Sequence, residues 1–350
     1  MRLIRIMTRS TETAMSDSLL EVRGLKVGFT LREGKVQAVD GITFQIPRGR
    51  VLGLVGESGC GKTVASKSLM RIEHPAVIEA GEILFHRTPS ETVTVQQLDP
   101  TGQEVRALRW NEIAMIFQEP MTSFGPMHTI GSQIEEALML HQDVSRKVAT
   151  EKAIEALISV GMPRPAIVMK QYPHQLSGGM RQRAMIAMAL CCHPSLLIAD
   201  EPTTALDVTT EAQILELLKE RQQALGMSIL YITHNLAVIA QIADEIIVMY
   251  LGRIVEHSDV ETLFLTPKHP YTRALLGSIP RVDQDPEGRL VAIEGTVPDP
   301  YTRPSGCPFH PRCPDCMPGL CDVKEPPNIS LADGTTVNCF LYSEAELVTR

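Results

Sequence analysis

The sequence has no excess of basic residues and no long uninterrupted run of apolar residues. Its 33 lysines and arginines against 41 aspartates and glutamates give the 350 residues a formal net charge of −8, which argues against the broad basic surface that a general nucleic-acid-binding protein needs. A membrane-spanning helix requires roughly 20 apolar residues, and even the apolar stretch 184–199 is broken by His193 and Pro194. We therefore expect a chain that neither binds nucleic acid nor crosses a bilayer.

The first residues also lack a secretory signal. Residues 1–14 carry three arginines but only a very short apolar stretch, and no secretory core follows it. We therefore expect a cytoplasmic protein. Met15 precedes the first strand-like segment in the way that an authentic start would, so we expect residues 1–17 to form a flexible or peripheral tail.

The chain has no internal repeat and no low-complexity tract, but its amino-acid composition changes near Pro267. Before that point, regular apolar patterns predict a folded domain over residues 18–265. After it prolines become frequent, and five of the eight cysteines lie between residues 307 and 339. We expect a Cys/Pro-rich, loop-rich C-terminal extension over residues 266–350.

The segment Gly56–Thr63, GESGCGKT, fits the phosphate-loop pattern G-x-x-x-x-G-K-[ST]. Such a loop turns backbone N–H groups toward phosphate oxygens, and the helix after it presents its positive N-terminus to the same anion. The apolar run 51–55 predicts the entering strand and residues 64–70 predict the helix, an order that argues against a merely structural turn. We expect Lys62 to neutralise the β and γ phosphates of a nucleotide and Thr63 to ligate Mg²⁺. The other phosphate-binding positions are Gly56, Ser58, Gly59, Cys60 and Gly61.

A second apolar strand, residues 196–199, is followed by the carboxylates Asp200 and Glu201. A carboxylate at the C-terminal end of a parallel strand beside a phosphate loop is placed to hold Mg²⁺ or its water, and we assign this role to Asp200. Glu201 is then the candidate general base for the attacking water. Alone, such a pair is usually a solvated turn. The phosphate loop favours the catalytic interpretation.

Between these two elements stands the segment Leu176–Arg183, LSGGMRQR. This segment resembles the signature of ABC ATPases, which most P-loop proteins lack. In that family the signature loop opens a helix whose N-terminus faces the γ-phosphate of ATP held by the other subunit. Ser177, Gly178 and Gly179 match those positions, although a serine-capped helix start would explain the same residue types. The resemblance implies an α/β P-loop NTPase core with an antiparallel β subdomain and an inserted helical subdomain.

Four further residues match elements of the ABC family in the expected order. Gln118 resembles the Q-loop glutamine that reaches Mg²⁺ and the attacking water. Asp207 resembles the D-loop residue at the dimer interface, and His234, after the predicted strand 228–233, resembles the switch histidine that contacts the γ-phosphate. Phe29 matches the aromatic residue that stacks on adenine, with a place at the edge of the core as the alternative.

The helical subdomain of the family corresponds to residues 119–175 of this chain. Apolar residues at three and four spacing predict helices over 130–141 and 148–160 within it. Residues 19–46 predict the antiparallel β region. In the family, the tip of the helical subdomain receives a coupling helix from a transmembrane subunit.

Several short sequence segments are similar to those of one branch of the family, the ATPases of dipeptide and oligopeptide importers. These are QEPMTS at 118–123, ADEPTTALDV at 199–208 and HPYTRALL at 269–276. Because the branch also transports nickel, glutathione, opines and some oligosaccharides, the solute stays open. The resemblance implies a peripheral ATPase at the cytoplasmic face of the cell membrane, with two transmembrane permease subunits and an extracytoplasmic solute-binding protein as partners.

The chain holds one phosphate loop and one signature, whereas a composite ATP site takes these from two subunits. We therefore expect a second ATPase subunit, usually a distinct homologue in this branch, with a homodimer as the alternative. A soluble ABC ATPase acting on DNA or ribosomes would need a long coiled-coil insertion or a second cassette. A regulatory subunit that binds ATP without hydrolysis is disfavoured by Glu201, His234 and the intact signature.

The cysteines of the extension stand among prolines and few large apolar residues. A segment of this kind lacks the hydrophobic content to order itself, and in a reducing cytoplasm a metal centre is a better crosslink than disulfides. Several peptide-importer ATPases carry a [4Fe-4S] cluster in a similar segment, with Zn²⁺ or free thiols as alternatives that spacing does not exclude. We expect a structural centre far from the phosphate site that crosslinks the extension to itself. Cys316 would be an additional cysteine outside the ligand set. The matching positions are Cys307, Cys313, Cys321 and Cys339.

Overall fold

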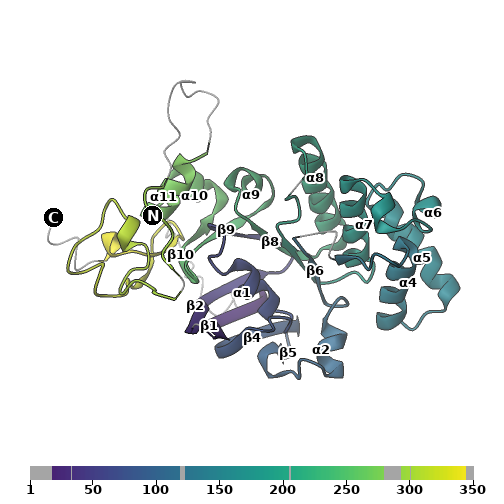
Figure 1. Ribbon diagram of the computed structural model, residues 1–350, viewed down its shortest axis with the longest axis horizontal. Coiled ribbons are helices and arrows are strands. Elements are labelled where there is room, and N and C mark those ends of the chain that lie inside the picture. Colours follow the sequence, from purple (N-terminus) through teal and green to yellow (C-terminus); the bar gives the residue numbers. More distant parts are fainter. Residues whose placement is uncertain are drawn as a thin grey trace, which may run out of the picture.

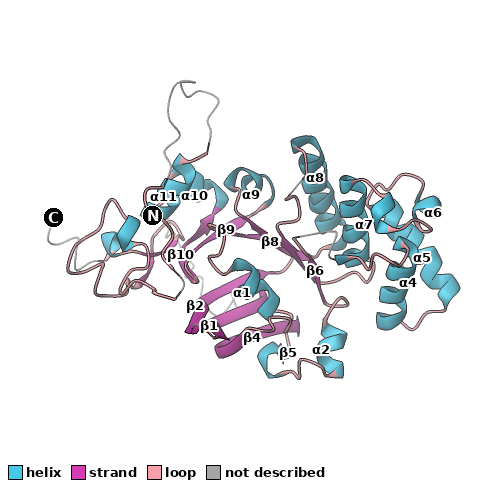
Figure 2. Ribbon diagram, viewed as in Figure 1, coloured by secondary structure: helices cyan, strands magenta, loops and turns pink. Residues whose placement is uncertain are grey.

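The computed structural model describes residues 18–32, 34–118, 123–204, 206–279, 293–299 and 301–343. The predicted N-terminal tail lies outside the described residues, as do four residues after Gln118 and Ala205 of the D-loop-like segment. Two sheets and a set of helices make up the described part (Figures 1 and 2). Among the described residues no helix is long and apolar enough to cross a membrane.

The first sheet is antiparallel and has the strand order β2-β1-β4-β5. The hairpin of β1 and β2 corresponds to the predicted antiparallel region, whereas β4 and β5 come from the chain after the phosphate-loop helix and were not predicted. Strand β4 pairs with β1 through partners such as Leu20 and Phe85. The bounds are β1 Ser18–Leu31, β2 Gly34–Pro47, β4 Val77–Thr88 and β5 Glu91–Thr94.

The second sheet has the strand order β11-β12-β10-β9-β3-β8-β7-β6. Strands β9, β3, β8, β7 and β6 run parallel, while β10, β12 and β11 are added in antiparallel fashion. All residues of β3, β6, β7 and β8 are buried, which explains why these strands are continuous apolar runs in the sequence. The bounds are β3 Val51–Val55, β6 Ile113–Ile116, β7 Leu196–Asp200, β8 Ser228–Thr233, β9 Glu245–Tyr250, β10 Arg253–Asp259, β11 Asn328–Ser330 and β12 Thr336–Asn338.

Helices surround the second sheet, and α4, α5 and α6 form a lobe beyond its β6 edge (Figure 1). The predicted helix over 130–141 is confirmed as α4, and α5 begins two residues before its predicted start because Ser145 caps it by accepting from the Val148 N–H. The bounds are α1 Lys62–Ser68, α2 Gln103–Leu108, α4 Ile130–His141, α5 Arg146–Ser159, α6 Pro165–Val168, α7 Gly178–Leu190, α8 Val208–Leu225, α9 Leu236–Ile242, α10 Val260–Leu265 and α11 Pro270–Gly277.

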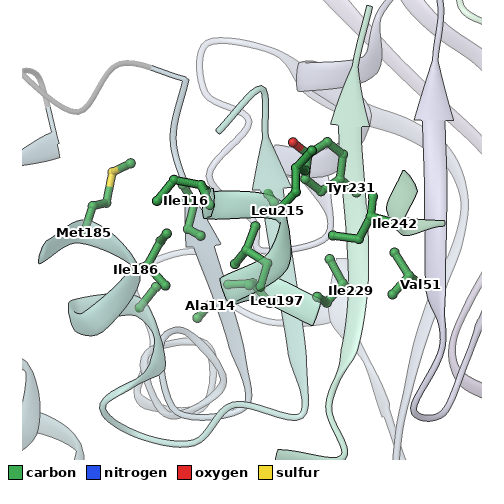
Figure 3. Close-up of a cluster of buried hydrophobic side chains, with 14 of the residues drawn as sticks. Val51, Ala114, Ile116, Met185, Ile186, Leu197, Leu215, Ile229, Tyr231 and Ile242 are labelled. Atoms are coloured by element: carbon green, nitrogen blue, oxygen red, sulfur yellow. The ribbon is translucent and has the colours of Figure 1, made fainter. Parts of the chain in front are cut away.

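The second sheet separates two hydrophobic clusters. On one face Leu197 and Ile229 belong to the cluster of α7, α8 and α9, where Ile186 and Leu215 lie (Figure 3). On the other face alternate residues such as Ile198 join the cluster of the antiparallel sheet and α1. The carboxyl ends of the parallel strands are thereby held rigidly between two packed layers, and the predicted site residues follow these ends.

The C-terminal extension packs on this core rather than forming a separate body. Strand β12 pairs with β10, so that part of the extension continues the main sheet. The Phe309 ring is fully buried and lies 5.2 Å from the Tyr250 ring and 5.3 Å from the Tyr271 ring. The extension therefore takes its order from the domain that it covers (yellow in Figure 1).

Candidate functional site

The loop Gly56–Thr63 joins β3 to α1, as predicted, and two of its glycines are sterically required. A Cβ on Gly56 would lie 2.2 Å from the Met249 carbonyl oxygen. Gly61 has φ +100°, and a Cβ there would lie 2.2 Å from the Ala38 carbonyl oxygen. Only glycine fits either position, so the loop can pass close to the neighbouring backbone in the tight conformation that anion-binding loops require.

Lys62 spans the loop that precedes it. Its ammonium donates to the Gly56 carbonyl at 2.8 Å and to the Glu57 carbonyl at 3.1 Å, and the residue is 5% exposed. The positive charge is thus fixed at the centre of the phosphate-loop segment, in a side chain that also lines the adjacent cleft. A rigid buried cation of this kind is suited to phosphate oxygens.

Asp200, the last residue of β7, lies against the first turn of α1. The Thr63 hydroxyl donates to its Oδ1 at 3.2 Å. Burial raises the pKa of Asp200 above its ordinary value, the hydrogen bond from Thr63 being an opposing effect. A hydroxyl and a carboxylate in contact are hard oxygen ligands of the type that Mg²⁺ prefers, so the two predicted metal ligands fit that ion.

Glu201 connects two predicted residues from different loops. Its Oε2 accepts from Gln118 Nε2 at 3.1 Å, and its Oε1 lies 3.1 Å from His234 Nδ1. Thr204, which was not predicted, donates its hydroxyl to the same carboxylate at 3.1 Å. Glu201 has a φ of +47°, a left-handed conformation that costs energy for a residue with a Cβ. The turn after β7 therefore holds this carboxylate in a strained and specific orientation.

A cleft of about 270 Å³ runs beside these residues. Phe29, Lys62, Thr63, Gln118 and Glu201 all line it, which brings the predicted aromatic residue, part of the phosphate loop and three predicted catalytic residues to one cavity. Asp200 and His234 are not among its lining residues. Several lining residues were not predicted, because they lie in segments without a local motif: Val36, Gln37, Ala38, Val64, Leu251, Gly252, Asp299 and Arg303.

The signature residues are not among those that line this cleft. Ser177 caps α7 by accepting from the Met180 N–H at 3.4 Å, and Gly179 faces Thr210 so closely that a Cβ would lie 3.0 Å from it. Asp207 caps α8 by accepting from the Thr210 N–H at 3.0 Å. In the single chain, Ser177 and Asp207 thus have local roles as helix caps.

The extension reaches the phosphate loop directly. Arg312 donates to both oxygens of Glu57, at 2.7 and 3.1 Å, and the Tyr271 hydroxyl accepts from the Glu57 N–H at 2.9 Å. We expected the cysteine centre to lie far from the phosphate site, but the segment that carries the cysteines contacts the phosphate loop. The residue before Cys313 forms a two-point ion pair with the loop, a contact between positions 255 residues apart.

The four cysteines matched to a cluster line one small cavity of about 10 Å³, and Cys316 is not among its lining residues. Burial raises the pKa of Cys313 to about 12 and that of Cys339 to about 11, and the nearby thiols add to both shifts. Four soft sulfur ligands around one cavity have the chemistry of an iron–sulfur or zinc centre. However, the described residues contain no group of three or more His, Cys, Asp or Glu arranged so that it could hold a metal ion.

Two family models match the sequence. Residues 39–204 match the ABC transporter family, and residues 255–321 match the C-terminal region of oligopeptide/dipeptide transporters. The first match contains the phosphate loop, the signature and Glu201. The second begins in β10 and contains three of the four matched cysteines.

Two relatives with named transport functions match nearly the whole chain. The oligopeptide transport ATP-binding protein AppD of Bacillus subtilis is 48% identical over 93% of this chain and 98% of its own length. The dipeptide transport ATP-binding protein DppD of Escherichia coli is 46% identical over 92% of this chain and 96% of its own length.

Solved structures agree on the fold. The dimeric, post-hydrolysis ATP-binding cassette MJ0796 bound to ADP and phosphate superposes with a TM-score of 0.61 at 24% identity, covering 69% of this chain and 98% of that one. CbiO1 of Clostridium perfringens gives a TM-score of 0.59 at 26% identity, covering 71% and 92%. Together with the site geometry, these similarities show that the chain belongs to the ATPase subunits of ABC transporters, in the group that carries the oligopeptide/dipeptide transporter C-terminal region.

Proposed function

We propose that this chain binds MgATP in the cleft and hydrolyses it, with Glu201 as general base. The observation that carries the proposal is the carboxylate of Glu201, held between Gln118 and His234 at the end of a cleft that Lys62 and Thr63 also line. In the proposed reaction, Glu201 accepts a proton from water as the water attacks the γ-phosphorus, and ADP leaves with the bridging oxygen.

The other residues of the site take supporting roles in this proposal. Lys62 neutralises charge on the β and γ phosphates, and His234 holds the γ-phosphate. Thr63 and Asp200 would hold Mg²⁺, which would screen phosphate charge, and Gln118 would orient the attacking water. Phe29 stacks on the adenine ring.

The site needs a second subunit, because the signature and Asp207 do not line the cleft of their own chain. In our proposal Ser177, Gly178 and Gly179 at the start of α7 bind the γ-phosphate held by the partner ATPase. Asp207 lies at the same interface. The partner is a distinct homologue, in keeping with the branch that the sequence resembles.

We propose peptides as the transported solute, supported by the printed functions of the oligopeptide and dipeptide relatives. The chain would work at the cytoplasmic face of the cell membrane. There it would work with two permease subunits, with the lobe of α4, α5 and α6 receiving a coupling helix from one of them, while a solute-binding protein delivers the peptide outside.

The decisive experiment is Glu201→Gln in the transporter assembled with its permeases in lipid vesicles. ATP turnover and peptide uptake should both fall by about 10²- to 10⁴-fold while MgATP binding persists, because only the proton acceptor is lost. Glu216→Gln, an exposed glutamate on α8, serves as the control and should leave turnover unchanged. Near-normal turnover in Glu201→Gln would refute the assignment. ATP turnover without a response to any peptide would refute the solute.

We also propose that Cys307, Cys313, Cys321 and Cys339 hold a [4Fe-4S] cluster, in preference to Zn²⁺. Support comes from the shared cavity of these four side chains and from the soft thiolate donor set. The cluster would supply a covalent crosslink between parts of the extension. The proposed role is structural.

Iron and acid-labile sulfide analysis after anaerobic purification tests this centre. Iron and sulfide should be present in equal amounts and should be lost in Cys321→Ser. They should be retained in Cys316→Ser, the matched control outside the cavity. Full zinc occupancy, or thiols that titrate freely in protein without iron, would eliminate the cluster.

A further inference from the structure

A segment of the extension forms part of the wall of the ATP cleft. Asp299 and Arg303 line the cleft together with Phe29, Ala38 and Gly252. Asp299 Oδ1 accepts from the Tyr301 N–H at 2.9 Å, and its carbonyl accepts from the Thr302 N–H at 3.0 Å. These two hydrogen bonds hold Tyr301 and Thr302 to Asp299, and Arg303 follows them in the wall of the cleft. This segment lies more than 200 residues after the phosphate loop in the sequence.

Two contacts align this segment with β2. The Tyr301 ring lies 3.5 Å from the position of a Cβ on Gly34, and Arg303 Nη1 donates to Asp40 Oδ2 at 2.7 Å. Gly34 and Asp40 stand on either side of 36–38, the part of β2 that lines the cleft. The segment thus faces the stretch of the β1–β2 hairpin where Phe29 pairs with Val36. This is the nucleoside end of the cleft in the proposed site.

The guanidinium of Arg303 has unused hydrogen-bonding capacity. Its Nη2 atom is buried and finds no hydrogen-bond partner in the described part of the chain. The atom lies 3.0 Å from the position of a Cβ on Gly252, a residue that also lines the cleft. A buried N–H group without a partner is costly, so a shift of the guanidinium toward an acceptor in the cleft would recover that energy.

Arg303 belongs to a network of ion pairs beside the cleft. Asp40 accepts from Arg303 and Arg253 at 2.7 Å each and lies 3.1 Å from Lys26 Nζ. Arg253 is further paired with Glu325 at 2.6 Å. With Asp299, which also lines the cleft, three cations face three carboxylates, so the formal charges around Arg303 balance.

We propose that Arg303 is a nucleoside-binding residue of the ATP site, donating hydrogen bonds to acceptor atoms of the ribose and adenine. The inference rests on the proposed nucleotide site and goes beyond it, because it makes the extension a part of that site. Arg253 is the matched reference, since it donates to the same Asp40 oxygen but does not line the cleft.

The proposed contact couples ATP binding to the docking of the extension. If ATP gains affinity from Arg303, ATP must stabilise the docked position of the extension by the same free energy. Inorganic tripolyphosphate has the phosphates without the nucleoside and should not have this effect.

Binding of MgATP and of Mg-tripolyphosphate to the full-length chain tests the proposal. Arg303→Met should weaken ATP binding by about tenfold, the value of one or two hydrogen bonds to a charged donor, and should leave tripolyphosphate binding unchanged. Arg253→Met should bind ATP within about twofold of the unaltered chain. Unchanged ATP affinity in Arg303→Met, or an equal loss in Arg253→Met, would overturn the proposal.

Hydrogen–deuterium exchange of the unaltered chain gives a second test, which does not depend on whether a substituted chain folds. ATP should slow exchange of the amides of residues 301–303 more than saturating tripolyphosphate does, and equal protection by the two ligands would overturn the proposal. Lys62→Ala separates this outcome from failure of the site itself. If Lys62→Ala keeps its affinity for both ligands, the proposed phosphate site is wrong, whatever Arg303 does.

Discussion

The phosphate loop and the C-terminal extension are neighbours in space, but they are specified in different ways. Eight consecutive residues encode the loop, and the glycines that it needs are dictated by backbone a few ångströms away. In its described residues the extension has only short helices and strands. It is held by separate contacts to distant partners, notably Phe309 in an aromatic pocket, Arg312 on Glu57 and β12 on β10.

The two regions therefore differ in what stabilises them and in what they contribute to the site. The loop gains its conformation from local geometry and gives the site its charge, whereas the extension gains its conformation from burial and ion pairs with the core. If this contrast is correct, weakening the anchors should detach the extension in proportion to how deeply each anchor is buried. Three tests, from the largest expected effect to the smallest, examine that order, and the last concerns an exposed pair within the extension.

Phe309→Ala should have the largest effect. The ring is fully buried between Tyr250, Tyr271 and His269, so its removal leaves a cavity and should lower the free energy of unfolding by about 3–5 kcal/mol. Urea unfolding followed by intrinsic fluorescence measures the loss. Tyr172→Ala, an aromatic residue that is 38% exposed, is the control. Equal losses in the two variants would contradict the view that burial of Phe309 anchors the extension.

The ion pair of Arg312 and Glu57 should have an intermediate effect, because the arginine side chain is 4% exposed and that of the glutamate 24% exposed. A double-mutant cycle with Arg312→Met and Glu57→Gln should give a coupling free energy of about 1–3 kcal/mol. The same cycle on Arg273 and Asp315, whose side chains are 44% and 40% exposed, should give less than about 1 kcal/mol. A coupling near zero for Arg312 and Glu57 would mean that the extension is not anchored to the loop.

The same contrast decides what could be predicted from sequence. The strand at 228–233 and the helix at 130–141 have continuous apolar or amphipathic patterns, and both were predicted with their correct bounds. The β4 strand was missed because Gly81 and alternating charged residues obscure its pattern, and its pairing with β1 decides its structure. Tertiary pairing outweighs local propensity there.

The candidate site divides in the same way. Lys62, Asp200, Glu201 and His234 could be found because each follows a strand or stands in a motif, and parallel strands bring their carboxyl ends together. Arg303 could not be found, because its partner Asp40 lies 263 positions earlier in the sequence. No spacing rule connects residues so far apart.

The surface pair of Lys268 and Asp333, 2.9 Å apart, should have the smallest effect. Its hydrogen bond from Lys268 lowers the pKa of Asp333 from 3.8 to about 2. Because the folded-state pKa is lowered, the stabilisation is complete above the unfolded value and is lost as the pH falls from about 4 toward about 2. Asp333→Asn should cost less than about 1 kcal/mol at pH 7, and the difference from the unaltered chain should shrink in urea titrations between pH 5 and pH 3. A difference that stays constant with pH would exclude this pair as its source.

Strand β12 has a consequence for solubility. It pairs with Glu256 and His257 of β10, and Asn338 donates to the Ile254 carbonyl at 2.7 Å, so the extension covers what would otherwise be the open edge of the main sheet. An uncovered edge strand offers unpaired backbone groups to any other extended chain. A shortened protein that stops after α10 would therefore keep its phosphate loop yet be prone to associate edge to edge. In this view the extension also keeps neighbouring molecules apart.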